Sequence, residues 1–228
     1  MLYACSASPL LLFLSLLALS AAAGPLTVGI MPFANNSLAD RESVAPLSKG
    51  LADMMITELS KIKSLKVIER ADLDKIIREA GLSQAGITDE SAAQNLGKLL
   101  GADLLLLGSF NNSFGGELRI DARLVKVETG ETVKAEEATG STKRFFKLVK
   151  KLSFKMAENL NLELSKEEKK ALDNPENEDY GALLEYSRGL DAEDHGDFVA
   201  ARDAYQKALA INKDFSQAKA RLDIVNAK

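Results

Sequence analysis

The chain has 228 residues, of which 46% are hydrophobic, and this composition excludes wholesale disorder. Its length suits one domain of ordinary size with an appendage. The formal net charge of −4 gives no reason to expect nucleic acid as a partner.

Residues 1–23 are predicted to be a secretory signal peptide. They contain no charged side chain. They include an apolar stretch over residues 9–19, followed by a cluster of small residues that ends at Ala23, where we expect cleavage. The apolar stretch is shorter than the roughly 20 residues that a membrane-spanning helix needs. No Lys or Arg precedes the stretch, which is unusual for a signal, so a retained anchor is the main alternative.

Residues suited to catalysis and metal binding are scarce. The lone cysteine, Cys5, falls inside the predicted signal, so the mature chain has no disulfide, thiolate metal site or cysteine nucleophile. The lone histidine, His195, lies beside acidic residues in a predicted turn, and we interpret it as a solvated residue, not a catalytic base. No phosphate-binding G-x-x-x-x-G-K-[ST] motif occurs. We therefore predict a protein that is not an enzyme, with no cofactor and no metal.

The first part of the mature chain alternates between strand and helix patterns. Apolar runs predict three buried strands, over residues 26–33, 65–68 and 102–107. Apolar residues at spacings of three and four predict three helices, one that Pro46 opens and others over residues 71–80 and 88–100. A polar loop over residues 34–45 separates the first strand from the first helix.

The pattern then changes to period two. Polar and apolar residues alternate over residues 117–124, which is typical of a strand with one face in water. The alternation slips at Leu124 and Val125, where we expect a bulge. A turn at residues 128–131 leads into a last strand and then a long helix. We expect an α+β fold, a mixed sheet covered by helices.

The long helix, over residues 142–160, has a cationic face. Its members are Lys143, Arg144, Lys147, Lys150, Lys151 and Lys155. We interpret this face as a candidate partner surface, suited to anionic lipid headgroups or to an acidic partner. The alternative is a solvated face opposite the apolar stripe. The polar loop over residues 34–45 is another candidate for partner contact.

The C-terminal part has a different organisation. Residues 165–180 are charged and include Pro175, so we predict a linker around a helical turn. Residues 181–214 have the length and pattern of one tetratricopeptide repeat, an all-α helical hairpin, and a capping helix is predicted after it, up to residue 228. The residues that carry this resemblance, and that we expect to pack the hairpin, are Gly189, Gly196, Ala201, Tyr205 and Ala208. A single repeat rarely stands alone, so it must pack on the first domain, on another copy or on a partner.

Several segments of the α/β part, residues 24–164, resemble the CsgG-like family. They read IMPFANNS, GLADMMITELSKIKSLKVIER, ADLDKIIREAGL, LGADLLLLGSF and RLVKVETGETV. The pair Glu69-Arg70 and the turn over residues 125–131 are the most specific parts. The family includes the secretion channel for curli fibres and related periplasmic proteins tied to flagella or to activation of cell-wall synthases. The resemblance implies an exported, periplasmic bacterial protein, or one associated with the outer membrane.

Channel members of the family insert long amphipathic hairpins, and each membrane strand needs about 9–11 residues. The two corresponding connections here, residues 111–116 and 140–145, are far shorter. The resemblance therefore implies the periplasmic body of the channel without its pore.

The function that we expect from this resemblance is binding without chemistry. The chain would be an envelope accessory protein that binds protein partners, self-associates or contacts a membrane peripherally. It would assist export, assembly or anchoring of a curli- or flagella-like surface structure. A ring-forming outer-membrane secretion component and a cell-wall synthase regulator are the alternatives.

Overall fold

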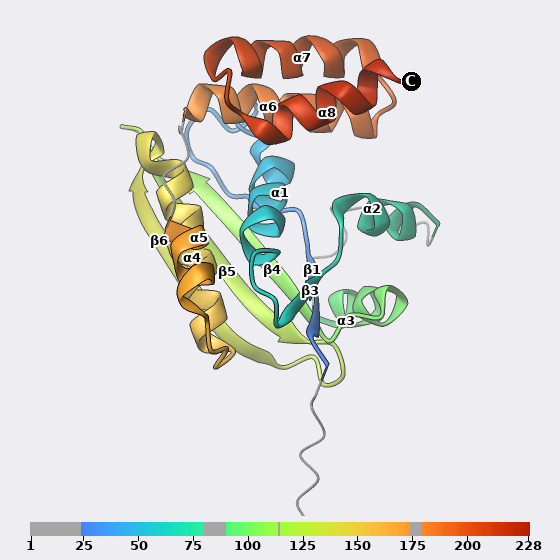
Figure 1. Ribbon diagram of the computed structural model, residues 1–228, viewed down its shortest axis with the longest axis vertical. Helices are drawn as coiled ribbons and strands as arrows, with labels where there is room; N and C mark the ends of the chain where they lie inside the picture. Colours follow the sequence, from blue (N-terminus) through green and yellow to red (C-terminus); the bar gives the residue numbers. More distant parts are fainter. Residues whose placement is uncertain (1–23, 80–89, 114, 174–178) are drawn as a thin grey trace, which may run out of the picture.

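The computed structural model describes residues 24–79, 90–113, 115–173 and 179–228 (Figure 1). The predicted signal peptide with Cys5, the predicted start of the third helix at Thr88, and Pro175 lie outside these residues. Within the described ranges, no helix combines the length and the apolar character that crossing a membrane requires.

A mixed sheet of six strands forms the centre of the α/β part, as predicted. Five strands follow the order β3-β1-β4-β5-β6, and β2 pairs with β4 beside this path. The pairs of β1 with β3 and β4 are parallel, whereas β4, β5 and β6 form an antiparallel meander. The strands are β1 (Leu26–Ile30), β2 (Ala34–Asn35), β3 (Leu65–Val67), β4 (Leu104–Asn112), β5 (Glu117–Lys126) and β6 (Thr132–Ser141).

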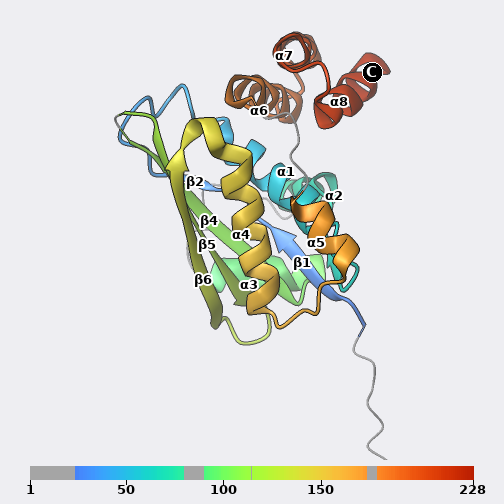
Figure 2. The same ribbon diagram turned by 60° about the vertical axis from the view of Figure 1, so that its left-hand side comes forward.

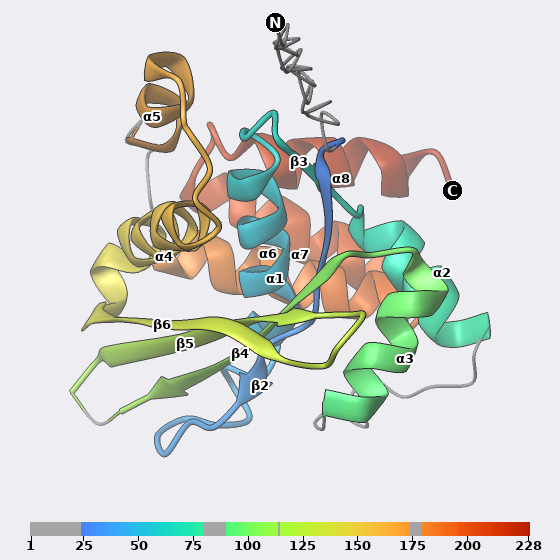
Figure 3. The same ribbon diagram turned by 90° about the horizontal axis from the view of Figure 1, so that it is seen from below.

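Helices pack on both faces of the sheet but cover them unequally (Figure 2, Figure 3). On one face, α1 (Leu47–Leu59) and α4 (Phe145–Asn159) bury the main apolar cluster against β4, β5 and β6. A short 3₁₀ turn, η2 (Thr142–Arg144), leads into α4. On the opposite face, α2 (Arg70–Glu79) and α3 (Glu90–Leu100) cover a smaller cluster near β1 and the beginning of β4.

The side chains of β4 explain the unequal cover. In its first half both faces are apolar, because Leu104 and Leu106 join the main cluster while Leu105 and Leu107 join the smaller one. In its second half only one face stays apolar, since polar Ser109 comes where another leucine would have continued the smaller cluster. Helices therefore cover the first half of β4 from both sides and the second half from one side.

Of three predicted details of the strands, the structure confirms one and differs from the other two. The register shift between Leu124 and Val125 confirms the predicted bulge. The third predicted strand, residues 102–107, is longer, because the backbone of β4 pairs with β5 as far as Asn112. The predicted loop over residues 34–45 includes β2, whose two residues the polar sequence did not reveal.

Residues 165–180, predicted as a linker around a helical turn, hold the eight-residue helix α5 (Lys166–Asp173). A reciprocal capping box starts it: the Glu168 backbone N–H donates to Ser165 Oγ, while Glu168 Oε2 accepts from the Ser165 N–H at 2.7 Å. The other Glu168 carboxylate oxygen accepts from the Lys63 N–H at 2.8 Å, which ties α5 to the α/β part. The S-x-x-E spacing was the signal for this helix.

The chain ends in three helices, α6 (Tyr180–Asp194), α7 (Phe198–Ile211) and α8 (Ser216–Asn226), hereafter the helical unit. Asp179 and Asp197 cap α6 and α7 by accepting backbone N–H groups. Figure 1 shows the unit at one end of the molecule, above α1. The sequence left three packing partners open for this unit, and in the structure it packs on the first of them, the α/β part. Membership of the tetratricopeptide family stays a prediction.

Candidate functional site

The last residues of β4 and the outward residues of β5 and β6 form a polar sheet face that no described helix covers. On β5, Arg119, Asp121 and Arg123 point to this face, whereas the intervening Ile120 and Ala122 are buried against the main cluster. This alternation is the one that the sequence predicted for a strand with one face in water. The open face is therefore a direct consequence of the period-two pattern.

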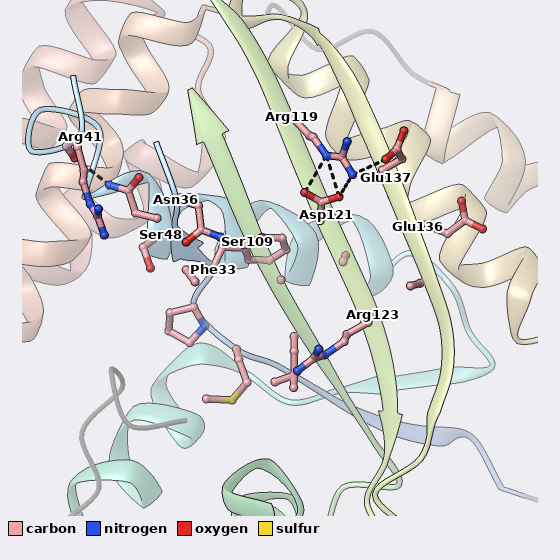
Figure 4. Close-up of a pocket in the computed structure, with 18 residues that line it drawn as sticks. Phe33, Asn36, Arg41, Ser48, Ser109, Arg119, Asp121, Arg123, Glu136 and Glu137 are labelled. Atoms are coloured by element: carbon pink, nitrogen blue, oxygen red, sulfur yellow. Dashed lines mark hydrogen bonds and ion pairs between the residues drawn. The ribbon is translucent and has the colours of Figure 1, made fainter. Parts of the chain in front are cut away.

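A groove of about 950 Å³ lies on this face (Figure 4). One wall is the segment from Met31 to Asn36 together with Arg41 and Ser48, and the other is formed by β5 and β6. The middle of β4, with Gly108 and Ser109, forms the floor. A volume of this size falls within the range of pockets that hold small molecules, and it also suits a few residues of an extended peptide.

One side of the groove carries a three-residue ion network. Strand pairing sets Asp121 directly opposite Glu137 on β6, and two carboxylates in such a position repel one another. Arg119 resolves the conflict, because its Nη2 lies 2.7 Å from Asp121 Oδ1 and the same nitrogen also pairs with Glu137 (Figure 4). The hydrogen bonds to Asp121, followed by the charges of Asp121 and Glu137, raise the pKa of Arg119. These three charges are thus satisfied without a ligand.

Arg41 and Arg123 differ from Arg119, because neither guanidinium has an ion-pair partner in the part of the chain that the structure describes. Figure 4 shows them on the two sides of the groove. The backbone of Arg41 is held in place, because its carbonyl oxygen accepts a hydrogen bond from Asn35 Nδ2 at 2.8 Å. Guanidinium groups recognise carboxylates through paired hydrogen bonds, so the groove is equipped to bind an acidic or polar group.

The side chains that line the groove define the contacts it can make. Its lining has charged, amide and hydroxyl side chains from the described residues and neither histidine nor cysteine. Among the residues that the structure describes, no cluster of three or more His, Cys, Asp or Glu side chains could hold a metal ion. These side chains can form hydrogen bonds and ion pairs with a molecule at this open surface.

A second charged cluster is buried between α1, α2 and α6, and Arg70 is its centre. The Arg70 Nη1 atom lies 2.7 Å from Asp194 Oδ1 on α6 and 3.1 Å from Asp74 Oδ2 on its own helix. Burial alone would lower the pKa of Arg70, but the charges of Asp194, Asp74 and Asp53 outweigh it and raise this pKa. Arg70 belongs to the pair Glu69-Arg70, one of the two most specific parts of the family resemblance, and here it forms a buried ionic anchor.

Lys49 extends the cluster along α1. Its Nζ atom lies 2.8 Å from Asp191 Oδ1 and 2.7 Å from Asp194 Oδ2, both on α6. One turn further along α1, Asp53 accepts a 2.7 Å hydrogen bond from the buried hydroxyl of Tyr186. Burial first, and then the Asp53 charge, raise the pKa of this phenol.

Close packing accompanies these charges. A Cβ atom at Gly50 of α1 would lie 1.9 Å from Ser187 Oγ of α6, so only glycine allows this approach. The helical unit is therefore anchored on the α/β part by charge and by shape together.

The six cations predicted on one helix over residues 142–160 do not form one uniform face, because Lys143 and Arg144 belong to the turn η2 and only the other four lie on α4. Lys155 is neutralised by Glu136 of β6, whose Oε2 lies 2.6 Å from its Nζ atom. The hydrogen bonds from Asn159 and then Lys155 lower the pKa of Glu136. Lys150 is half-buried and has an interaction partner. The exposed members are Lys143, Arg144, Lys147 and Lys151.

Four of the five predicted repeat residues are buried in the helical unit, and Gly196 lies in a turn. A Cβ atom at Gly189 would lie 2.3 Å from the Tyr205 ring, and Tyr205 itself is fully buried. Ala201 and Ala208 have no exposed surface. Gly196 has a φ of +77° in the turn between α6 and α7. The lone histidine, His195, is exposed in that same turn, as predicted.

Sequence reasoning did not single out the groove. It identified the water-facing residues of β5 and the loop that carries Arg41, but their proximity depends on β2, which pairs in parallel with β4. The ionic anchor was missed as well, because Arg70 and Asp194 are 124 residues apart in the chain.

The fold and the groove define an α/β domain with an open, polar sheet face. Residues 11–112 match the family model of the curli production assembly/transport component CsgG. This match confirms, over these residues, the resemblance to the CsgG-like family that was inferred from the sequence. A search of curated proteins found no match.

Solved structures similar to this chain include three bacterial proteins. The NMR structure of Escherichia coli LpoB is 18% identical, with 52% of this chain and 57% of that chain covered and a TM-score of 0.43. Lipoprotein GNA1162 from Neisseria meningitidis is 16% identical, with 60% and 99% covered and a TM-score of 0.42. The PelC dodecamer from Paraburkholderia phytofirmans is 12% identical, with 62% and 90% covered and a TM-score of 0.37.

Proposed function

We propose that this chain is a non-enzymatic accessory protein of the bacterial envelope that binds a protein partner in the groove on its open sheet face. The match to the CsgG family model supports a location in the envelope, because the family is named after a component of curli production, assembly and transport. In this role the protein would assist export, assembly or anchoring of a surface structure.

The observation that carries the proposal is the groove itself. A sheet face that is only exposed to water does not need a groove of about 950 Å³. It also does not need an arginine on each side of that groove without an ion-pair partner among the described residues. Recognition of a protein segment uses such features, because the arginines supply directional ionic contacts and the strand surface supplies a flat floor.

Site-specific photo-crosslinking in intact cells tests the proposal. A photoreactive amino acid at Ala135, an exposed residue of β6 that lines the groove, is expected to trap a defined envelope protein. The same amino acid at Lys207, exposed on α7, is the control and should not trap that protein. The Arg123→Glu variant should weaken the Ala135 crosslink, because it reverses a charge of the groove. Equal trapping at both positions, or no trapping at Ala135, would contradict the proposal.

The identity of the trapped protein separates the remaining alternatives. Fibre or flagellar components would support an assembly role. A ladder of copies of this chain would favour a ring-forming secretion component, and a cell-wall synthase would favour a regulator of that enzyme.

A further inference from the structure

The solvent side of α4 and of the turn before it is a strip of four exposed cations, Lys143, Arg144, Lys147 and Lys151, here called the α4 strip. The last three are spaced three and four residues apart, so they lie on one side of the helix. None of the four side chains forms an ion pair with another residue that the structure describes.

The stability of α4 does not account for the α4 strip. The first turn of the helix has no acidic residue, and Lys143 and Arg144 lie just before it. A helix N-terminus carries partial positive charge, so cations at this end are unfavourable. Six basic residues and no acidic residue occur between Thr139 and Ala157, in a chain whose net charge is −4.

Nearby carboxylates leave the α4 strip unbalanced. Glu136 is engaged by Lys155 and Asn159, and Glu137 pairs with Arg119 on the opposite face of the sheet. Glu158 follows the strip at the C-terminal end of α4. The positive charge is therefore concentrated toward the N-terminal end of the helix.

We propose that the α4 strip rests on an anionic membrane surface. The strip lies on the outside of α4 and its preceding turn, and it spans about 10 Å from Arg144 to Lys151 at the rise of an α-helix, so its cations meet several lipid headgroups together. The groove, by contrast, lies on the other side of the sheet. Lysine ammonium groups act as mobile point charges and suit a fluid array of phosphates better than a single fixed carboxylate.

This contact fixes the orientation of the molecule. Figure 3 shows α4 on one side of the sheet, whereas β2 and the loop after it lie on the other. A chain held by α4 therefore presents its groove away from the lipid. The inference does not depend on which partner the groove takes.

Vesicle co-sedimentation of the full chain tests the proposal. One set of vesicles is phosphatidylcholine, and the other contains equal parts of phosphatidylcholine and phosphatidylglycerol. A retained apolar N-terminus would increase binding to both sets of vesicles. The difference in bound protein between the two sets therefore reports on the charge of the lipid. We expect a preference for the anionic vesicles that disappears as salt is raised, because a Debye length of about 8 Å already operates at physiological salt.

The decisive variant is Arg144→Gln/Lys147→Gln/Lys151→Gln. Each cation near an anionic surface contributes about fivefold in partition, so this variant should lose about 100-fold of the anionic preference. The matched control, Lys98→Gln/Lys213→Gln/Lys219→Gln, removes the same charge from exposed positions elsewhere and should keep it. Equal losses in both variants would refute the proposed membrane contact of the α4 strip. Wild-type protein that binds both sets of vesicles equally would refute it as well. Circular dichroism checks that both variants fold.

Discussion

At the scale of single residues, Arg70 governs the largest buried charge cluster of the described structure. Three carboxylates surround its guanidinium, which is about nine-tenths buried. A buried cation of this kind gives little net stability compared with an apolar residue, but removing it leaves carboxylates buried without a counter-charge.

The Arg70→Ala variant is expected to lose about 3–5 kcal/mol of unfolding free energy for this reason. Urea denaturation followed by circular dichroism measures the loss. Lys75→Ala on the exposed side of the same helix is the control and should stay within about 0.5 kcal/mol of wild type. A loss below 1 kcal/mol for Arg70→Ala would show that the cluster relaxes or admits water.

Two carboxylates of this cluster respond to acid with opposite signs. Burial would raise the pKa of Asp194, but Arg70 and Lys49 outweigh it and lower this pKa below its ordinary value of 3.8. The stabilising contribution of Asp194 is therefore complete above pH 3.8 and is lost as the pH falls through the lowered pKa. Burial, and then the Asp194 charge, raise the pKa of Asp74, so the folded state gains a proton there before the unfolded state does. Acidification through that range stabilises the protein.

We therefore expect Asp194→Asn to lessen the acid-dependent loss of stability and Asp74→Asn to increase it. Urea midpoints measured from neutral pH to below 3.8 give both slopes. The expected assignment of the two carboxylates is wrong if both variants change the slope in the same direction.

At the scale of elements, the approach of α6 to α1 depends on the absence of a side chain at Gly50. The Gly50→Ala variant must displace Ser187, and overpacking of this kind costs about 1–3 kcal/mol. The gain in helix propensity, about 1 kcal/mol, offsets part of this cost. Adding Ser187→Ala removes the hydroxyl that the new methyl group meets, so the double variant should recover stability. Additive losses in the double-mutant cycle would argue against this contact.

The capping box of α5 gives a smaller and more local effect. Ser165→Ala should cost about 1 kcal/mol, because it leaves a backbone N–H of the first turn without its acceptor. Thermal denaturation is a sufficient measurement, and Ser216→Ala at the exposed start of α8, where the hydroxyl caps no backbone group, is the comparison.

Elements were predictable where the chain carries its own periodicity. The helices over residues 47–59 and 145–159 and the strand over 117–126 have clear apolar spacings, and their burial patterns follow them. β2 was not predictable, because a two-residue strand has no period and forms only when β4 lies beside it. α5 was obscured by its charged composition, since the capping box specifies where a helix starts while the apolar count alone argues against one.

At the scale of the whole molecule, the ionic anchor and the packing of α6 on α1 join the two parts of the chain. The main apolar cluster runs without interruption from the sheet through α1 into α6, α7 and α8. Parts that share one core unfold together. Calorimetry should show a single transition with equal calorimetric and van't Hoff enthalpies, whereas two separate transitions would mean that the helical unit folds independently.

The groove belongs to this scale as well, which is why the sequence did not reveal it. Its two arginines lie on segments 82 residues apart and come together only when β2 docks against β4 and β5 completes the meander. The cations of α4 were visible in the sequence, but which of them remain exposed depends on β6, because Glu136 takes Lys155.

The partners of Lys49 have a consequence for anyone who wishes to isolate the α/β part of the chain. The match to the CsgG family model ends at residue 112, and both carboxylates that pair with Lys49 lie on α6, far beyond it. A chain trimmed to the α/β part would retain Lys49 and Arg70 with fewer counter-charges, and it would expose the face of α1 that α6 now covers. A minimal domain would therefore need redesign at α1, with the two cations replaced and polar side chains placed along the uncovered face, before it could be handled as a separate module.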